Sequence, residues 1–159
     1  MKKYFSSKVF TLLLATICIS AVSVVANPKP KKPKSASAAK IEMLNDALAA
    51  MKFKNVQFAF NKTEIPAAYY PTLDKVAKLM VDNDAALKVE GYADNKGGFV
   101  YNWKLSKARA DAVKEYLKSK GATEARIAAT EYGYTKPIAS NKTKAGRQKN
   151  RRVEVHFAE

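Results

Sequence analysis

The chain has 159 residues and is strongly basic, with 29 Lys and Arg residues against 14 Asp and Glu residues and a formal net charge of +15. This length fits one folded domain, and a single cysteine, Cys18, excludes a disulfide framework and a thiolate-rich metal site. The charge favours anionic partners, among them nucleic acid, anionic lipids and anionic wall polymers.

Residues 1–26 are predicted to be a signal peptide. Lys2 and Lys3 provide a positive start, an apolar run follows from residue 9 to residue 25, and small-residue cleavage chemistry ends at Ala26. The alternative is an uncleaved membrane anchor, because the run approaches the roughly 18 apolar residues that span a bilayer. Both interpretations place the rest of the chain outside the cytoplasm.

Residues 27–50 are predicted to form a basic tether rich in Pro, Lys and Ala that ends in a short lead-in helix. Residues 27–40 include no large apolar side chain, which indicates an extended, charged segment. From Ile41 to Met51 the apolar residues recur at helical spacing, which predicts the lead-in helix.

The folded domain is predicted to span residues 51–159, with element order β-α-β-α-β-β. Apolar residues alternate in the strand segments and recur at helical spacing in the helix segments. The expected elements are a strand at 56–61, a helix from 71, a strand at 87–90, a helix at 101–120 that stops at Gly121, and strands at 126–132 and 152–157. Residues 133–151 are expected to form a loop. The predicted fold is an α+β sandwich, a mixed sheet with both helices on one face.

Arg109 does not fit the apolar pattern of the helix predicted at 101–120. It lies four residues after Leu105 and four before Val113, and therefore on the same, core-facing side of the helix. A guanidinium in a core is costly unless it is paired and hydrogen-bonded. One interpretation is structural, with Arg109 reaching the domain edge or pairing with an internal carboxylate. The other is a binding role.

Asp94 is the second candidate. It lies in a loop that is flanked by Gly residues and directly follows a predicted strand. Loops held by a rigid scaffold are common positions for binding residues. Asp94 and an inward Arg109 together offer an acceptor and a bidentate donor, which suit the ammonium and carboxylate of an amino-acid head. An Asp94–Arg109 salt bridge without a ligand is the competing interpretation, and spacing does not separate the two.

Three segments resemble a known family. Gly91-Tyr92-Ala93-Asp94-Asn95, followed by Leu105-Ser106 and Arg109-Ala110, resembles the signature of OmpA-like peptidoglycan-binding domains of the OmpA C-terminal, Pal and MotB type. The strand at 56–61 and the tail at 132–155 are similar to the opening and closing segments of that family. The resemblance covers residues 56–157.

The resemblance implies a site for meso-diaminopimelate, an amino acid of the stem peptide in the cell wall. Asp94 would bind its free ammonium and Arg109 its carboxylate. Asn102 and Asn61 would line the same pocket, and Arg152 would border it. Ala93 stands where the family usually has Thr, and the lost hydroxyl predicts a lower affinity.

The function implied is non-enzymatic binding of peptidoglycan in the periplasm, or at the outer membrane, of a Gram-negative bacterium. The sole histidine, His156, is far in sequence from any Ser or Asp that would complete a triad, and no cofactor or metal ion is expected. Another envelope protein, reached through the N-terminal segment, is a further expected partner; nucleic acid is not, and membrane association is not required. The alternatives are a membrane-anchored wall tether and a basic periplasmic protein that binds anionic polymers by charge alone.

Overall fold

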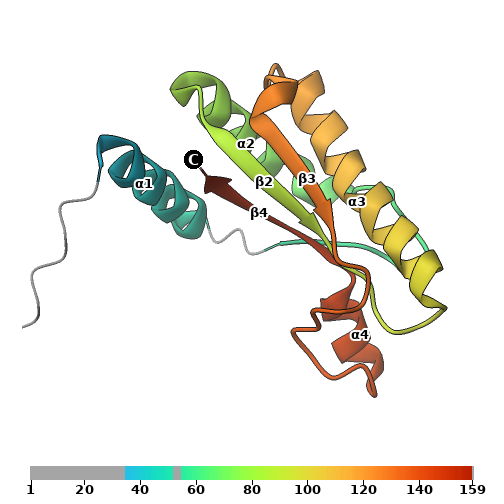
Figure 1. The fold of residues 1–159 in the computed structure, drawn as a ribbon. Coiled ribbons are helices and arrows are strands. Elements are labelled where there is room, and N and C mark those ends of the chain that lie inside the picture. Colours follow the sequence, from blue (N-terminus) through green and yellow to red (C-terminus); the bar gives the residue numbers. More distant parts are fainter. Residues whose placement is uncertain (1–34, 52–54, 159) are drawn as a thin grey trace, which may run out of the picture. The chain divides into compact units, whose positions relative to one another are not determined.

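The computed structural model describes residues 35–51 and 55–158, so the predicted signal peptide lies outside the described residues. Figure 1 shows the fold. Its elements are α1 (Ala36–Ala50), β1 (Val56–Gln57), α2 (Tyr70–Asn83), β2 (Ala86–Gly91), α3 (Phe99–Ser119), β3 (Ile127–Glu131), α4 (Lys144–Asn150) and β4 (Arg152–Ala158), with 3-10 turns at Ala67–Tyr69 and Glu124–Arg126. Within the described ranges, no helix combines the length and hydropathy needed to cross a membrane.

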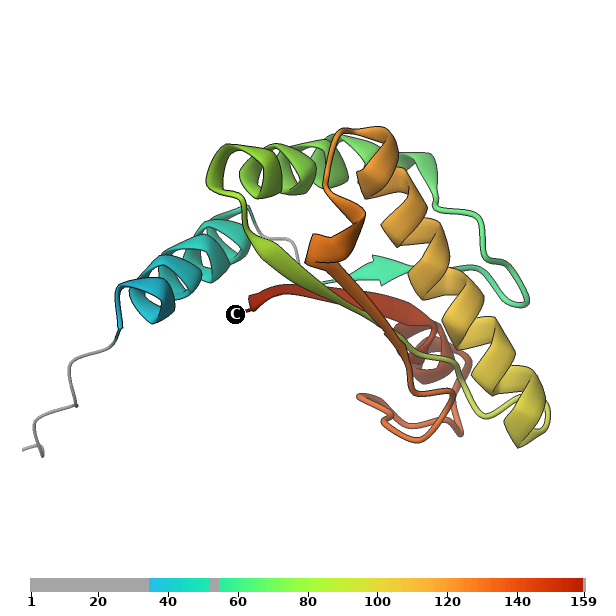
Figure 2. The same cartoon turned by 45° about the horizontal axis from the view of Figure 1, so that its top comes forward.

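The strands form one mixed sheet in the order β1-β4-β2-β3. β2 and β3 are parallel and are joined through α3, whereas β4 is antiparallel to both β1 and β2. Helices α2 and α3 lie together on one face of this sheet (Figures 1 and 2). The predicted α+β class and its mixed sheet are therefore confirmed.

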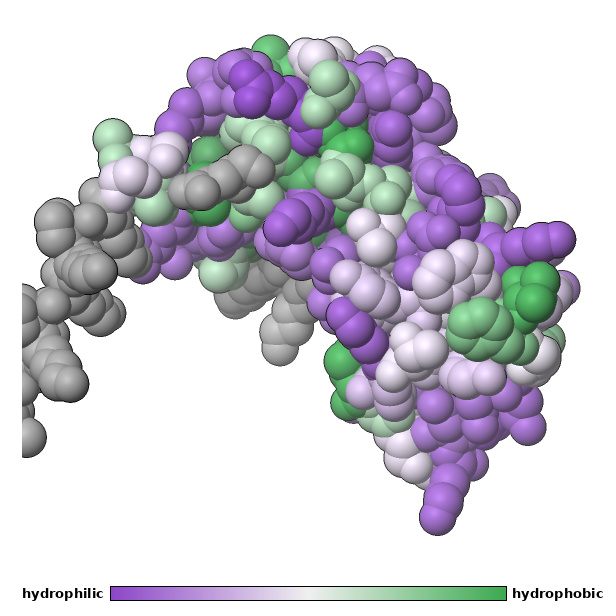
Figure 3. All heavy atoms as spheres, viewed as in Figure 1, coloured by the Kyte–Doolittle hydropathy of each residue, from purple (hydrophilic) through white to green (hydrophobic). Residues whose placement is uncertain are grey.

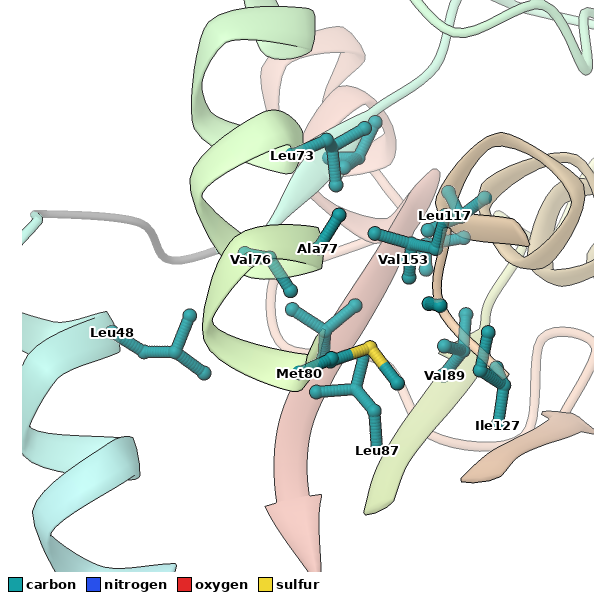
Figure 4. Packing of buried hydrophobic residues seen from close by; sticks show 14 of the residues in the cluster. Leu48, Leu73, Val76, Ala77, Met80, Leu87, Val89, Leu117, Ile127 and Val153 are labelled. Carbon is teal, nitrogen blue, oxygen red and sulfur yellow. The ribbon is translucent and has the colours of Figure 1, made fainter. Parts of the chain in front are cut away.

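The hydrophobic core lies between that face of the sheet and the two helices (Figure 4). Val76 and Met80 of α2 point toward Leu87 of β2, and Leu117 of α3 closes the same cluster. All four side chains are at most 3% exposed, and full burial of a side chain of this size stabilises the fold by roughly 1.5–3 kcal/mol. The helical and alternating patterns of the sequence correctly identified these inward positions.

Helix α1 is longer than predicted and belongs to the folded unit. It starts at Ala36, inside the segment expected to be an extended tether, because the Ser35 hydroxyl caps it by accepting a hydrogen bond from the Ala38 backbone N–H. Leu44 and Leu48 are buried in the core. The Asn45 side chain donates a hydrogen bond to the carbonyl of Phe157 in β4 at 3.1 Å and accepts one from the backbone N–H of the same residue at 2.9 Å. The lead-in helix is thus fixed to the sheet.

Strand β1 is shorter than predicted. The apolar alternation suggested a strand through Asn61, but pairing with β4 ends at Gln57, and Phe60 is 62% exposed. The chain instead turns, with the Lys62 backbone N–H bonded to the Ala59 carbonyl and Asn61 at a φ of 56°. This turn points two backbone carbonyls toward the end of the sheet, where they serve the site described below.

Helix α4 replaces part of the predicted loop before the last strand. The Thr143 hydroxyl caps it by accepting from the Gly146 N–H at 3.0 Å. A Cβ on Gly146 would lie 2.0 Å from the Ser140 carbonyl oxygen, so only glycine allows this close approach. The helix has no apolar stripe, which explains why hydrophobic periodicity did not reveal it.

Exposed apolar side chains gather over the first turn of α3, on a surface that is otherwise mainly hydrophilic (Figure 3). Phe99, Val100 and Trp103 are 51%, 64% and 38% exposed. The rings of Phe99 and Trp103 lie 5.5 Å apart, and Tyr134 meets Phe99 edge-on. These contacts place the aromatic rings beside the loop that connects β2 to α3.

Candidate functional site

A close approach between β2 and α3 positions the site. A Cβ on Gly91, the last residue of β2, would lie 2.0 Å from the Ser106 carbonyl oxygen, so this position requires glycine. The Ser106 hydroxyl donates to the Trp103 carbonyl at 2.8 Å and accepts from the Gly133 N–H at 2.9 Å. These contacts hold the N-terminal half of α3 against the end of β2 and against Gly133, which follows β3.

Arg109 of α3 is completely buried, as the helical spacing predicted. Its Nε donates to the Lys62 carbonyl at 2.9 Å, and its Nη1 donates to the Tyr92 carbonyl at 3.1 Å. Its Nη2 donates to the Ala59 carbonyl at 3.3 Å, and the guanidinium lies 5.4 Å from the ring centre of Phe58. Backbone carbonyls from two loops, rather than a carboxylate, therefore accept three of the five N–H groups of this arginine.

Asp94 is also buried, at 3% exposure, and its partner is Arg151. The Arg151 Nη1 donates to one carboxylate oxygen at 2.7 Å, and the Lys96 backbone N–H donates to the other at 2.9 Å. The competing interpretation of an Asp94–Arg109 salt bridge is wrong, because the ion pair of Asp94 among the described residues is with Arg151. Sequence reasoning missed Arg151, although it lies in the matched closing segment beside Arg152.

Asp94, Arg109 and Arg151, named here the acid–arginine cluster, bury two positive charges against one negative charge. Burial first, and then the like charge of Arg151, lower the pKa of Arg109 to about 10, while the charge of Asp94 opposes the shift. A buried charge without a partner is unfavourable. The cluster is therefore electrostatically suited to accept an additional anion.

Asn102 and Asn61 lie at the edges of this cluster. The buried Asn102 side chain donates to the carbonyls of Lys96, Gly97 and Gly98 at 3.0, 3.1 and 3.3 Å, which holds the loop after Asp94. The exposed Asn61 accepts a hydrogen bond from the Tyr101 hydroxyl. Asn102 thus shapes the loop, and Asn61 lies on the outer rim.

Arg152 is not brought into the acid–arginine cluster. It is 2% exposed, its guanidinium stacks 3.8 Å from the ring centre of Tyr92, and its Nε donates to Glu154 at 2.6 Å. Its remaining bonds reach the carbonyls of Lys136 and Asn150. The structure places Arg151, rather than Arg152, beside Asp94, and a ligand-binding role for Arg152 stays a prediction.

A hollow of about 390 Å³, named here the basic hollow, opens beside the acid–arginine cluster. It is lined by Phe60, Lys96, Lys144, Arg147 and Arg151. Arg151 belongs both to the hollow and to the ion pair with Asp94, so the two features are continuous. Across residues 35–51 and 55–158, no group of His, Cys, Asp and Glu is arranged to hold a metal ion.

A small mixed sheet with two helices on one face and a buried acid–arginine cluster at the sheet's end define an α+β domain with a buried charged site. Residues 57–151 match the OmpA family, and the chain belongs to this family. The resemblance noted in the sequence is confirmed.

Several proteins share this domain. Outer membrane porin F of Pseudomonas fluorescens is 40% identical over 102 residues, which cover 64% of this chain and 31% of porin F. The peptidoglycan-binding protein ArfA of Mycobacterium tuberculosis is 35% identical over 138 residues, which cover 86% of this chain and 41% of ArfA. The chain thus spans less than half the length of these two relatives.

Among solved structures, the peptidoglycan-associated lipoprotein from Burkholderia pseudomallei superposes with a TM-score of 0.68 and 27% identity. The match covers 72% of this chain and 98% of that protein.

Proposed function

We propose that this chain binds peptidoglycan non-covalently through the meso-diaminopimelate of the stem peptide, and so tethers or stabilises the bacterial cell envelope without catalysing a reaction. Membership of the OmpA family supports this proposal. A relative and a structural neighbour are named for the same polymer, ArfA as a peptidoglycan-binding protein and the Burkholderia protein as peptidoglycan-associated.

The observation that carries the proposal is the unbalanced charge of the acid–arginine cluster. A free amino-acid head brings one carboxylate and one ammonium, and the carboxylate compensates the excess positive charge of Arg109 and Arg151. The guanidinium of Arg109 has five N–H groups. Three of them donate hydrogen bonds to carbonyls, and the others are left to donate to a carboxylate. The two oxygens of Asp94 have lone pairs left beyond those used by Arg151 and Lys96, and these accept the ammonium.

The proposed location is the periplasm or the periplasmic side of the outer membrane of a Gram-negative bacterium, reached with the predicted signal peptide at residues 1–26. A further envelope partner at the N-terminal segment remains part of the proposal. Leu44 and Leu48 are used by the domain's own core, so such a partner would contact the outer side of α1, where Met43 is 59% exposed.

The test is sedimentation of the full chain with purified peptidoglycan sacculi at low and at high salt. Arg109→Lys is the informative variant, because it keeps the charge but loses the planar donor set. Arg109→Ala is unsuitable, since it would leave three carbonyls, among them the buried carbonyl of Tyr92, without their donor and destabilise the fold. Arg126→Lys is the matched control, because Arg126 is exposed and pairs with Asp84 away from the site.

We expect the wild type and Arg126→Lys to sediment at both salt concentrations and folded Arg109→Lys to stay soluble. Free meso-diaminopimelate should release the wild type from sacculi, whereas Nα-acetyl-lysine amide, whose free end carries an ammonium but no carboxylate, should not. If all three proteins sediment at low salt only, the basic surface alone explains binding, as in the alternative of a charge-driven polymer binder. Equal release by Nα-acetyl-lysine amide would remove the diaminopimelate assignment.

A further inference from the structure

The basic hollow is lined by positive charge without a matching negative charge of its own. Lys96, Lys144, Arg147 and Arg151 line it together with Phe60, and none of these lining residues is acidic. Arg151 is the only one of the four cations with a carboxylate partner among the described residues, namely Asp94.

The other three cations are available to a ligand. The side-chain ammonium groups of Lys96 and Lys144 make no hydrogen bond or ion pair with another described residue. Arg147 donates from Nη1 to the carbonyls of Asn141 and Lys142, at 2.8 and 3.1 Å, which orients its guanidinium but leaves its charge uncompensated. Cations gathered around a hollow focus a positive potential into it and raise the local concentration of anions.

The hollow shares Arg151 with the acid–arginine cluster and is joined to it by Lys96. Arg151 lines the hollow and holds the Asp94 carboxylate at 2.7 Å, and Lys96 lines it while its backbone N–H bonds the other carboxylate oxygen. Two residues that line the hollow therefore contact Asp94 directly. The hollow's volume of about 390 Å³ equals roughly a dozen water molecules. That is room for one further amino-acid residue beside the bound head.

We propose that the basic hollow is a second anion subsite, which binds the free carboxylate of the residue that follows diaminopimelate in an uncrosslinked stem peptide. Lys96, Lys144 and Arg147 supply the positive charge, and the exposed ring of Phe60 contacts the aliphatic part of that residue. This inference rests on the proposed function and names its preferred ligand, a stem peptide that ends in a carboxylate rather than in an amide or a crosslink.

The test compares two forms of one dipeptide by isothermal titration calorimetry with the full chain. The dipeptide is meso-diaminopimelate joined to D-alanine and acetylated on the amine next to the peptide bond, prepared as the free acid and as the C-terminal amide. For the wild type we expect the free acid to bind about tenfold more tightly than the amide.

Paired variants separate the hollow from the general charge of the surface. Lys96→Gln/Lys144→Gln should bring the two forms to within about twofold, while the amide, which has no carboxylate beyond the bound head, binds as before. Lys142→Gln/Lys149→Gln removes the same charge from exposed residues outside the hollow and should keep the preference for the acid.

The outcomes distinguish the subsite from the proposed function. If meso-diaminopimelate binds but the wild type does not discriminate acid from amide, the subsite is refuted and the proposed function stands. If meso-diaminopimelate fails to bind while the acid is still preferred in a Lys96- and Lys144-dependent way, the subsite stands and the diaminopimelate assignment falls. The remaining outcome concerns inorganic phosphate. If phosphate binds the wild type as tightly as the acid dipeptide does, and competes with it, the peptide assignment is overturned.

Discussion

Replacing Asp94 by asparagine perturbs the charge balance of the acid–arginine cluster at almost constant side-chain volume. The variant leaves the buried guanidiniums of Arg109 and Arg151 without a carboxylate. Removing one partner of a buried ion pair costs about 3–5 kcal/mol, because an uncompensated charge remains. The side chains of Asp94 and Arg151 are 3% and 10% exposed, so solvent screens the pair only weakly. We therefore expect a loss of about 3 kcal/mol in the free energy of unfolding.

Urea unfolding of the full chain, followed by circular dichroism, measures this loss. With a slope of about 1–3 kcal/mol per M, the midpoint should fall by about 1–3 M. Asp111→Asn is the matched control on α3, because its pair with Lys107 is exposed and is worth at most about 1 kcal/mol. If the midpoint of Asp94→Asn falls no further than that of the control, the buried pair does not hold the site. A double variant with Arg151→Gln should recover part of the loss.

Three further variants test the fold around the site by urea unfolding. Leu48→Ala should lower the free energy of unfolding by about 2–5 kcal/mol because α1 is part of the core, and an effect below about 0.5 kcal/mol would indicate a free tether. Gly91→Ala should cost about 1–3 kcal/mol because its Cβ would press on the Ser106 carbonyl, and an unchanged midpoint would contradict that contact. Burial, and next the hydrogen bond to Glu90, raises the pKa of the Tyr92 phenol above its usual value near 10. The resulting stabilisation is therefore present below pH 10 and lost as the pH rises beyond it. Tyr92→Phe should show a smaller fall in midpoint between about pH 9 and about pH 11 than the wild type, and an equal fall would refute the shift.

The sequence predicted best where one element alone determines which side chains point inward. The spacing of Val76 and Met80 on α2 and the alternation around Leu87 on β2 each define a buried face within a single element, and the core confirms both. Arg109 was placed inward by the same reasoning, because residues four apart on a helix share a face. Gly121 was likewise predicted to end the second helix, and it has the left-handed φ of 95°.

The sequence predicted poorly where a segment's conformation depends on a distant partner. The alternation through Phe60 indicated a longer β1, but the chain turns there and offers the carbonyls of Ala59 and Lys62 to Arg109. The composition of residues 36–40 indicated a tether, yet α1 extends through them and is held to β4 by Asn45. In both segments long-range contacts outweigh the local pattern.

The sequence by itself determined the α+β class, the family, an inward Arg109 and a loop that presents Asp94, because each follows from local spacing or a contiguous motif. The tertiary structure decided which arginine pairs with Asp94. Arg151 lies 57 residues away along the chain, and it reaches the carboxylate only because β4 lies between β1 and β2 in the sheet. It also decided that Arg152 faces Tyr92 and Glu154 instead. Neighbouring arginines are equivalent in a sequence pattern, and only the register and direction of the strand distinguish their environments.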